Sequence, residues 1–235
     1  CLLTGTINSP TLQAQIDKFL GQFPHARQVT CDALSSSAIA DAHAQTHAAR
    51  AIPQFQFDMA EVIVSFAADF LGTWISPVQF TKQRTAGRQI DAEHPTMAYH
   101  AQFESCMTLT GSNADYRMAL APAEIGLALT HLAVKVAELT STAWDAQQLD
   151  PSPIPQAVID DLATRLTQAK GKSLVISGEQ DVQVQTLCNF INHTLENYGK
   201  TLNLAQPSSI RLGNDTELQS LVDDMKQGRI GALLV

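Results

Sequence analysis

The feature that most constrains the fold of this chain is the apolar run Val62-Ile-Val-Ser-Phe66. The run has the length of a strand, and it lacks the strict alternation of polar and apolar residues that marks a strand with one solvated face. Strands buried on both faces occur almost only in parallel sheets that are covered by helices. We therefore expect a parallel sheet at the centre of this protein.

Strands and helices are predicted to alternate along the chain. Ser9 and Pro10 are typical of a helix start, with a capping hydroxyl followed by a proline, and Ser76-Pro77 repeats the pattern. Gly199 is typical of the glycine that follows a helix. The predicted strands are 2–5, 27–31, 62–66, 98–104, 116–120, 173–177 and 230–235, and the predicted helices are 9–20, 35–49, 76–88, 122–139, 154–169, 181–197 and 216–226. Strands separated by helices form βαβ units, so we expect an α/β fold with three αβα layers and a mainly parallel sheet.

Residues 146–155 are predicted to be the only clear linker, because they contain three prolines. We therefore expect an α/β lobe over residues 1–145 and a second α/β portion over residues 156–235 that is truncated at its C-terminus. The chain begins at Cys1 without a methionine and stops inside the apolar segment 231–235. Both ends are interpreted as cut, so the chain is expected to be a fragment.

Charge and composition exclude some classes of protein. The formal net charge is −8, and no cluster of Lys and Arg stands out, so nucleic acid and anionic lipid are poor partners for this chain. Apolar runs such as Val62–Phe66 and Ile230–Val235 have strand length, shorter than a membrane span requires. No N-terminal signal peptide is recognised. We expect a globular domain without direct membrane insertion.

The four cysteines and the histidines do not form a ligand motif. Cys1, Cys31, Cys106 and Cys188 are far apart, whereas structural zinc and iron–sulfur sites draw on closely spaced ligands. Buried free thiols are the favoured interpretation. His43 and His47 have helical i, i+4 spacing and could share a metal, but no third ligand is nearby, so we expect no metal site.

Three turns that follow predicted strands are candidate binding sites, because open parallel sheets bind ligands at the carboxyl ends of their strands. Thr4-Gly5-Thr6 lacks the further glycines of a dinucleotide fingerprint. The segment 68–74 (Ala-Asp-Phe-Leu-Gly-Thr-Trp) offers Asp69, Gly72 and Trp74, and the segment 108–117 ends at Arg117. For each turn we favour a structural role over ligand binding. The structural roles are capping of the local backbone, packing in the core or formation of an ion pair.

Several motifs resemble the molybdopterin oxidoreductase superfamily. The segments 62–74 and 103–117, and the strand, glycine turn and helix of 178–199, follow the order of that family's cofactor-binding elements. Ala68-Asp-Phe-Leu-Gly-Thr-Trp74 and Leu109-Thr-Gly-Ser-Asn-Ala-Asp-Tyr-Arg117 look like the molybdopterin-like domain in the iron–sulfur subunit of alternative complex III. The resemblance implies Rossmann-like layers as in the central domains of formate dehydrogenase and DMSO reductase.

The departures from the family's pattern indicate that this domain does not bind the family's cofactor. Asp69 stands where the resemblance places a glycine-rich cofactor turn, and its charge would repel a diphosphate. Glu104 replaces the family's Asp-Pro-Arg turn, and Ser35 falls near the position of the metal ligand. Ser35, Asp69, Gly72, Glu104 and Arg117 are therefore expected to be vestigial cofactor positions, with no catalytic residue, no metal and no cofactor in this chain.

The resemblance implies a non-catalytic scaffold domain in a periplasmic, quinol-oxidising respiratory complex. Its expected partners are other subunits of that membrane-bound complex and a ferredoxin-like domain of the same subunit, which would hold the iron–sulfur clusters. One alternative is an active molybdopterin-dependent oxidoreductase with Ser35 as metal ligand. Another is a nucleotide-binding module that uses the turn at Gly5 or Gly72.

Overall fold

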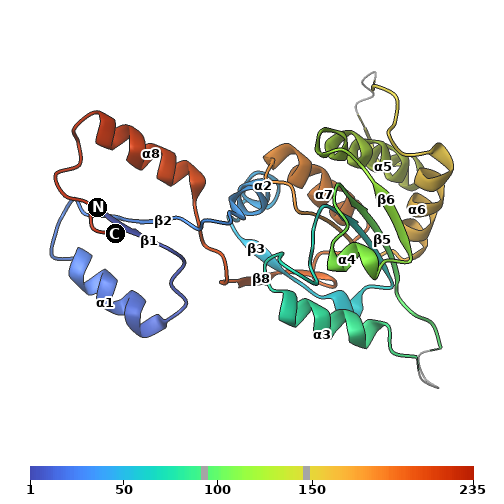
Figure 1. The fold of residues 1–235 in the computed structure, drawn as a ribbon, viewed down its shortest axis with the longest axis horizontal. Helices are drawn as coiled ribbons and strands as arrows, with labels where there is room; N and C mark the ends of the chain where they lie inside the picture. The colour runs from blue at the N-terminus through green and yellow to red at the C-terminus, as the bar shows by residue number, and fades with distance from the viewer. Residues whose placement is uncertain (91–94, 145–148) are drawn as a thin grey trace.

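The computed structural model describes residues 1–90, 95–144 and 149–235. Figure 1 shows two unequal parts, a larger main lobe and a smaller lobe that holds both ends of the chain. We define the terminal lobe as residues 1–32 and 211–235, and the main lobe as the described residues between them.

A four-stranded parallel sheet forms the centre of the main lobe. Its strands follow the order β6-β5-β4-β7, and β4 pairs in parallel with both β5 and β7. The strands are β4 (Val62–Phe66), β5 (Tyr99–Glu104), β6 (Tyr116–Ala119) and β7 (Ser173–Ser177). The prediction of an α/β fold with a mainly parallel sheet is confirmed.

The apolar run of β4 is explained by the two faces of the sheet. Val62, Val64 and Phe66 join one hydrophobic cluster, which also contains apolar residues of three helices. Ile63 points the other way, into a second cluster with Phe57 and other aromatic side chains. Successive strand residues alternate between faces, so a strand covered on both sides needs apolar residues at nearly every position. Each such buried side chain contributes roughly 1.5–3 kcal/mol.

Helices surround this sheet in the main lobe (Figure 1). Leu129, Leu132 and Val136 lie on one face of α5 and are buried in the first cluster. The helices of the main lobe are α2 (Ser37–His47), α3 (Pro77–Gly87), α4 (Leu109–Ser112), α5 (Ile125–Thr140), α6 (Gln156–Gln168) and α7 (Val182–Thr194), with short 3-10 turns at Phe57–Met59 and Pro122–Glu124.

Two strands that the sequence analysis did not predict form an antiparallel ribbon beside the main sheet. They are β3 (Ile52–Phe55) and β8 (Leu202–Ser208). Ile52 pairs with Ser208, but the next pair along β3 is Gln54 with Asn203, so the register shifts between these pairs. Residues 204–207 of β8 therefore have no paired partner on β3.

The terminal lobe brings the two ends of the chain together. It contains β1 (Leu2–Thr4), α1 (Pro10–Leu20), β2 (Gln28–Thr30) and α8 (Asp215–Lys226). The strands β1 and β2 are parallel, and Leu2 also forms a parallel bridge with Leu234. The predicted final strand 230–235 is reduced to this single bridge. Figure 1 shows the two helices on opposite sides of the short strands.

The ends of three helices test the predicted capping residues. The Ser9 hydroxyl accepts the Leu12 N–H at 3.3 Å and Pro10 begins α1, as predicted. Pro77 begins α3, but Ser76 forms no side-chain cap, so that part of the prediction is wrong. Gly199 lies beyond α7, which ends at Thr194. Its positive φ of 80° serves a turn in which its N–H donates to the Leu202 carbonyl at 2.7 Å.

The predicted linker 146–155 lies partly outside the described residues, since 145–148 are not described. Strand β7 follows this segment and pairs with β4, which precedes it, so the two predicted portions share one sheet. The boundary itself stays a prediction. Among the described residues, no helix combines the length and the apolar character needed to cross a membrane.

Candidate functional site

The carboxyl ends of the four parallel strands meet at one edge of the main sheet. The chain runs outward from β4 to β5 and β6, and then returns to β7 on the other side of β4. This reversal places a topological switch point between β4 and β7, the position at which open α/β sheets bind their ligands.

The turn after β4 is built around Asp69. One carboxylate oxygen, Oδ1, accepts the Thr110 hydroxyl at 2.7 Å and the Thr110 N–H at 3.3 Å. The Asp69 carbonyl accepts the N–H groups of Gly72, Thr73 and Trp74. A Cβ atom added to Gly72 would lie 2.1 Å from Asp69 Oδ2, so only glycine lets the carboxylate fold back over its own turn. The space beside Gly72 is therefore occupied by the Asp69 side chain.

Glu104, at the end of β5, is the buried carboxylate of this edge, with 3% of its side chain exposed. It accepts Arg117 Nε at 2.6 Å, the Thr108 hydroxyl at 2.6 Å and the Thr108 N–H at 3.1 Å. Burial disfavours the charged form, but the bonds from Thr108 and Arg117 outweigh it and hold the pKa of Glu104 below its ordinary value. Glu104 is therefore an ionised partner of Arg117, and it is unsuited to be a general acid at neutral pH.

The short helix α4 joins these two carboxylates. Its Thr110 bonds to Asp69, its preceding residue Thr108 bonds to Glu104, and a Cβ atom added to Gly111 would lie 1.8 Å from Glu104 Oε1. The sequence analysis named the segment 108–117 as a candidate turn but assigned no role to Thr108, Thr110 or Gly111. The Thr-x-Thr-Gly sequence was the available signal, since the Thr108 hydroxyl also caps α4 by accepting the Gly111 N–H.

Four of the five predicted site residues come together here. Asp69, Gly72, Glu104 and Arg117 lie at the same edge, within one hydrogen-bonded network. Ser35 lies elsewhere, because its hydroxyl donates to Asp215 of α8 at 2.6 Å, at the junction with the terminal lobe. The carboxylates at the sheet edge accept hydrogen bonds from side chains of this chain, and the network joins the turn after β4, the segment around α4 and strand β6.

Close backbone contact occupies the switch point between β4 and β7. The Gly178 N–H donates to the Phe66 carbonyl at 2.8 Å, and a Cβ atom added to Gly178 would lie 2.3 Å from the Ala67 carbonyl oxygen. Ala67 has a φ of 55°, a strained value for a residue with a side chain. The loops after the two strands therefore touch at the point where a ligand would enter.

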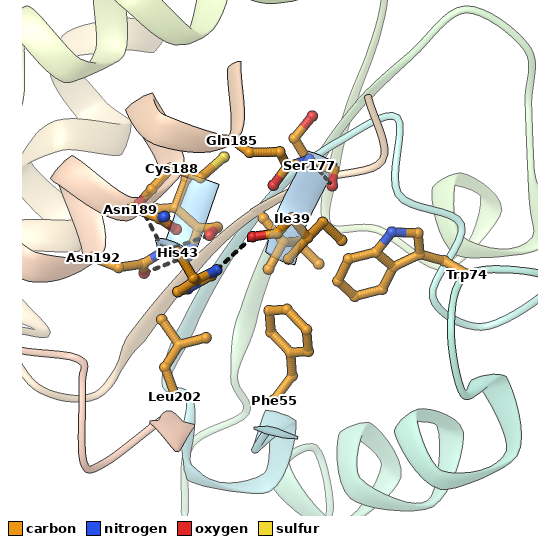
Figure 2. A pocket seen from close by; sticks show the side chains of 12 residues that line it. Ile39, His43, Phe55, Trp74, Ser177, Gln185, Cys188, Asn189, Asn192 and Leu202 are labelled. Atoms are coloured by element: carbon orange, nitrogen blue, oxygen red, sulfur yellow. Dashed lines mark hydrogen bonds between the residues drawn. The ribbon is translucent and has the colours of Figure 1, made fainter. Parts of the chain in front are cut away.

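A small cavity lies near this contact (Figure 2). Figure 2 shows Phe55 and Trp74 beside Ile39, with His43 and the polar side chains of α7 across from the indole. The cavity has a volume of about 10 Å³, which is room for about one water molecule. The indole N–H of Trp74 is buried and has no hydrogen-bond partner among the described residues.

His43, which lines the cavity, is held neutral. Its Nδ1 donates to the Ile39 carbonyl at 2.7 Å, drawn as a dashed line in Figure 2, and its Nε2 accepts the Tyr198 hydroxyl at 3.0 Å. Burial lowers the pKa of His43 to about 4. His47 lies beside it at a ring-centroid separation of 5.6 Å. Within the described part of the chain, no group of three His, Cys, Asp or Glu side chains could hold a metal ion.

The cysteines of the described chain are all free, and they differ in exposure. Cys188 is buried against the cavity, and burial raises the pKa of its thiol, which suits a packed side chain rather than a nucleophile. Cys106 is exposed, and Cys1 and Cys31 are half-buried.

The fold and this edge define a protein of the α/β class with a mainly parallel sheet whose carboxyl edge is closed by its own side chains. No protein-family model and no curated protein matches the chain. Among solved structures, it is similar to a chain in the crystal structure of the formyltransferase/hydrolase complex from Methylorubrum extorquens, in complex with methylofuran. The TM-score is 0.53 and the sequence identity is 12%, and the match covers 83% of this chain and 50% of the other. This chain therefore matches about half the length of that one, and the likeness concerns the fold.

The comparison overturns the resemblance drawn from sequence motifs. The expected family, the molybdopterin oxidoreductases, and the expected scaffold function in alternative complex III are wrong, because the similar structure is a formyltransferase/hydrolase complex. The same finding contradicts the predicted respiratory partners and the predicted association with iron–sulfur clusters. The motif residues Phe70 and Trp74 are buried core side chains, 0% and 9% exposed, so packing accounts for them. The alternative in which Ser35 ligates a metal lacks support, since the Ser35 hydroxyl donates to Asp215 of α8.

Proposed function

We propose that this chain is an assembly subunit, or a large part of one, in a multi-subunit enzyme of the formyltransferase/hydrolase type. The observation that carries the proposal is the fold likeness over 83% of the chain to a chain of such a complex. Because the sequence identity is 12%, the activity of that complex is a hypothesis to be tested for this chain.

The closed edge of the main sheet favours a role in assembly over a role in catalysis. Asp69 and Glu104 are bonded to side chains of this protein, and the Gly178 contact occupies the switch point. The cavity beside it has room for one water. This arrangement supports the further proposal, first made from sequence, that the chain carries no cofactor of its own.

A three-layer αβα arrangement of the main lobe is part of the same proposal. Two separate hydrophobic clusters support it, one containing residues of α5, α6 and α7 and the other containing Phe57, Phe70 and Phe80. Residues of β4 belong to both, so the sheet lies between them. Such a lobe is a rigid body suited to holding partner proteins in fixed positions.

The exposed apolar side chains of α1 are the surface we assign to a partner subunit. Leu12, Phe19 and Phe23 are 48%, 43% and 50% exposed. Leu12 and Phe19 are seven residues apart and so lie on one face of the helix, and the ring of Phe23, in the turn after the helix, lies 5.2 Å from that of Phe19. Helix α1 has no fully buried residue, so this face is only partly covered within the chain.

The test is purification of the full chain from its own host, with measurement of formyltransferase and formyl-hydrolase activity. We expect both activities to co-purify with the chain, together with partner subunits identified by mass spectrometry. The double variant Phe19→Ser/Phe23→Ser should lose at least about 90% of the co-purifying activity, because an interface depends on a few large apolar residues. The variant Val78→Ser, at a residue that is 85% exposed on α3, is the matched control and should retain it.

Two outcomes would contradict the proposal. If the purified chain alone carried either activity, it would be an enzyme in its own right. If it purified as a monomer with no formyl-handling activity in any fraction, or with redox proteins, the fold likeness would not extend to function.

A further inference from the structure

A second and larger cavity lies on the β3–β8 ribbon. Its volume is about 220 Å³. It lies where β3 and β8 lose their register, beside the start of α3. The residues that line it are Pro53, Gln54, Phe55, Ile75, Ser76, Gln79, Phe80, Pro207, Ser208, Ser209 and Ile210.

The backbone around this cavity is irregular. The register shift leaves residues 204–207 unpaired with β3, and Pro53 and Pro207 have no N–H with which to continue the ladder. Ile75 has a φ of 53°, which is rare and costly for a β-branched residue. Strain of this kind persists where the surrounding structure fixes it, and it is concentrated at binding sites.

The lining divides into an apolar and a polar part, and it contains no charged residue. Pro53, Ile75, Pro207 and Ile210 supply apolar surface, and the rings of Phe55 and Phe80, which are 5% and 3% exposed, border the cavity edge to face with centroids 6.1 Å apart. Gln54, Ser76, Gln79, Ser208 and Ser209 supply carboxamides and hydroxyls. The Ser76 hydroxyl does not cap α3, and its nearest bond is a long one of 3.5 Å to Gln79 Oε1, so it is free to serve another acceptor or donor.

We propose that this cavity binds a small, uncharged molecule that carries a carboxamide on an apolar body. A carboxamide both donates and accepts, which matches the glutamine and serine side chains, and an apolar body matches the proline, isoleucine and phenylalanine side chains of the lining. A carboxylate or an ammonium group would lose hydration here without meeting an opposite charge, so charged analogues bind less well. The inference does not depend on the proposed assembly function.

The test uses benzamide as the probe, with benzoate and toluene as matched comparisons, and follows amide chemical shifts of the ¹⁵N-labelled full chain. Benzamide should bind with a Kd of order 1 mM, as small fragments do, and its shifts should be confined to residues that line the cavity. Benzoate and toluene should each bind at least about fivefold more weakly, because one brings an uncompensated charge and the other lacks the hydrogen bonds.

Variants separate this site from general surface binding. Gln54→Ala and Ser76→Ala should each weaken benzamide about five- to tenfold, the usual effect of one lost hydrogen bond. Val78→Ala, in the same helical turn but outside the lining, should leave the affinity unchanged. No benzamide shifts up to about 10 mM, tighter binding of benzoate, or unchanged affinity in both cavity variants would overturn the proposal.

Discussion

At the scale of the residue, two buried histidines stand out as neutral groups within the fold. His100, on β5, is fully buried; its Nε2 lies 3.2 Å from Gln102 Oε1, and its Nδ1 has no partner among the described residues. Burial and the nearby Arg84 lower the pKa of His100 to about 4, and burial lowers that of His43 to about 4 as well. Both therefore resist protonation in the folded state.

We predict that stability falls as the pH decreases from about 6.5 to about 4. Above pH 6.5 both histidines are neutral in the folded and unfolded states; below it the unfolded chain takes up protons that the folded chain does not. Each histidine then lowers the free energy of unfolding by up to about 1.4 kcal/mol per pH unit. Urea denaturation at several pH values should show a smaller slope for His100→Leu than for the wild type. His25→Gln, at an exposed position, should keep the wild-type slope. Equal slopes in wild type and His100→Leu would disprove the assignment.

Individual site residues were predictable where strand geometry determines their position. Asp69, Glu104 and Arg117 follow or lie in neighbouring parallel strands, so their placement at one edge follows from the order of the strands. The roles of Thr108 and Thr110 were not predictable, because they depend on how the α4 turn lies over the carboxylates. The contact of Ser35 was not predictable either, because its partner, Asp215, lies 180 residues away in the sequence.

At the scale of the element, left-handed residues end two helices without glycine. Ala48 is the C-cap of α2 with a φ of 54°, and Ser141 is the C-cap of α5 with a φ of 54°. A left-handed conformation costs a residue with a Cβ atom roughly 1–2 kcal/mol, and glycine adopts it without that cost.

The variant Ala48→Gly should therefore raise the free energy of unfolding by about 0.5–1 kcal/mol. The matched control Ala44→Gly, inside the same helix, should lower it by about 1 kcal/mol, because a helical position favours alanine. Thermal or urea denaturation measures both. A loss of stability in Ala48→Gly would show that the C-cap conformation is not left-handed in solution.

Elements with strong periodicity were predicted well, and those set by tertiary contacts were not. The run Val62–Phe66 became β4 with the same bounds, and Ser173–Ser177 became β7. Strands β3 and β8 escaped prediction because each contains a proline and their pairing is irregular, so neither shows the period of a strand. The end of α7 was placed too late, since Gly199 serves a turn and not the helix.

At the scale of the whole molecule, the two lobes differ in how much apolar surface they bury. Both hydrophobic clusters consist of main-lobe residues. Among the described residues of the terminal lobe, the buried apolar side chains are those of Val29 and Leu221. A sheet of two short strands is marginal without such a core.

We predict that the terminal lobe opens independently of the main lobe. Amides of β1 and β2 should exchange with solvent at least about tenfold faster than those of β4 and β5, because their opening exposes less buried surface. Val29→Ala should increase exchange in the terminal lobe while leaving β4 unchanged, as measured by hydrogen–deuterium exchange with NMR or mass spectrometry. Equal protection of both lobes, lost together in Val29→Ala, would mean that the chain unfolds as one cooperative unit.

The fold class was predictable from the apolar runs alone, but membership in a family was not. Periodicity and burial restrict the chain to a parallel α/β sheet, and many unrelated proteins share that architecture. The motifs that suggested a molybdopterin oxidoreductase include Phe70, Trp74 and Asp69, whose positions are explained by core packing and turn capping. These residues are therefore explained by the packing and the turns of the fold, and they do not indicate a particular reaction.

The contacts that close the terminal lobe join residues far apart in the sequence. The Cys1 nitrogen donates to the Ala232 carbonyl at 2.8 Å, 231 residues away. The strands of the main sheet all lie within residues 62–177, so their pairing spans shorter stretches of chain. Because contacts of high sequence separation form slowly, we expect the terminal lobe to close after the main sheet.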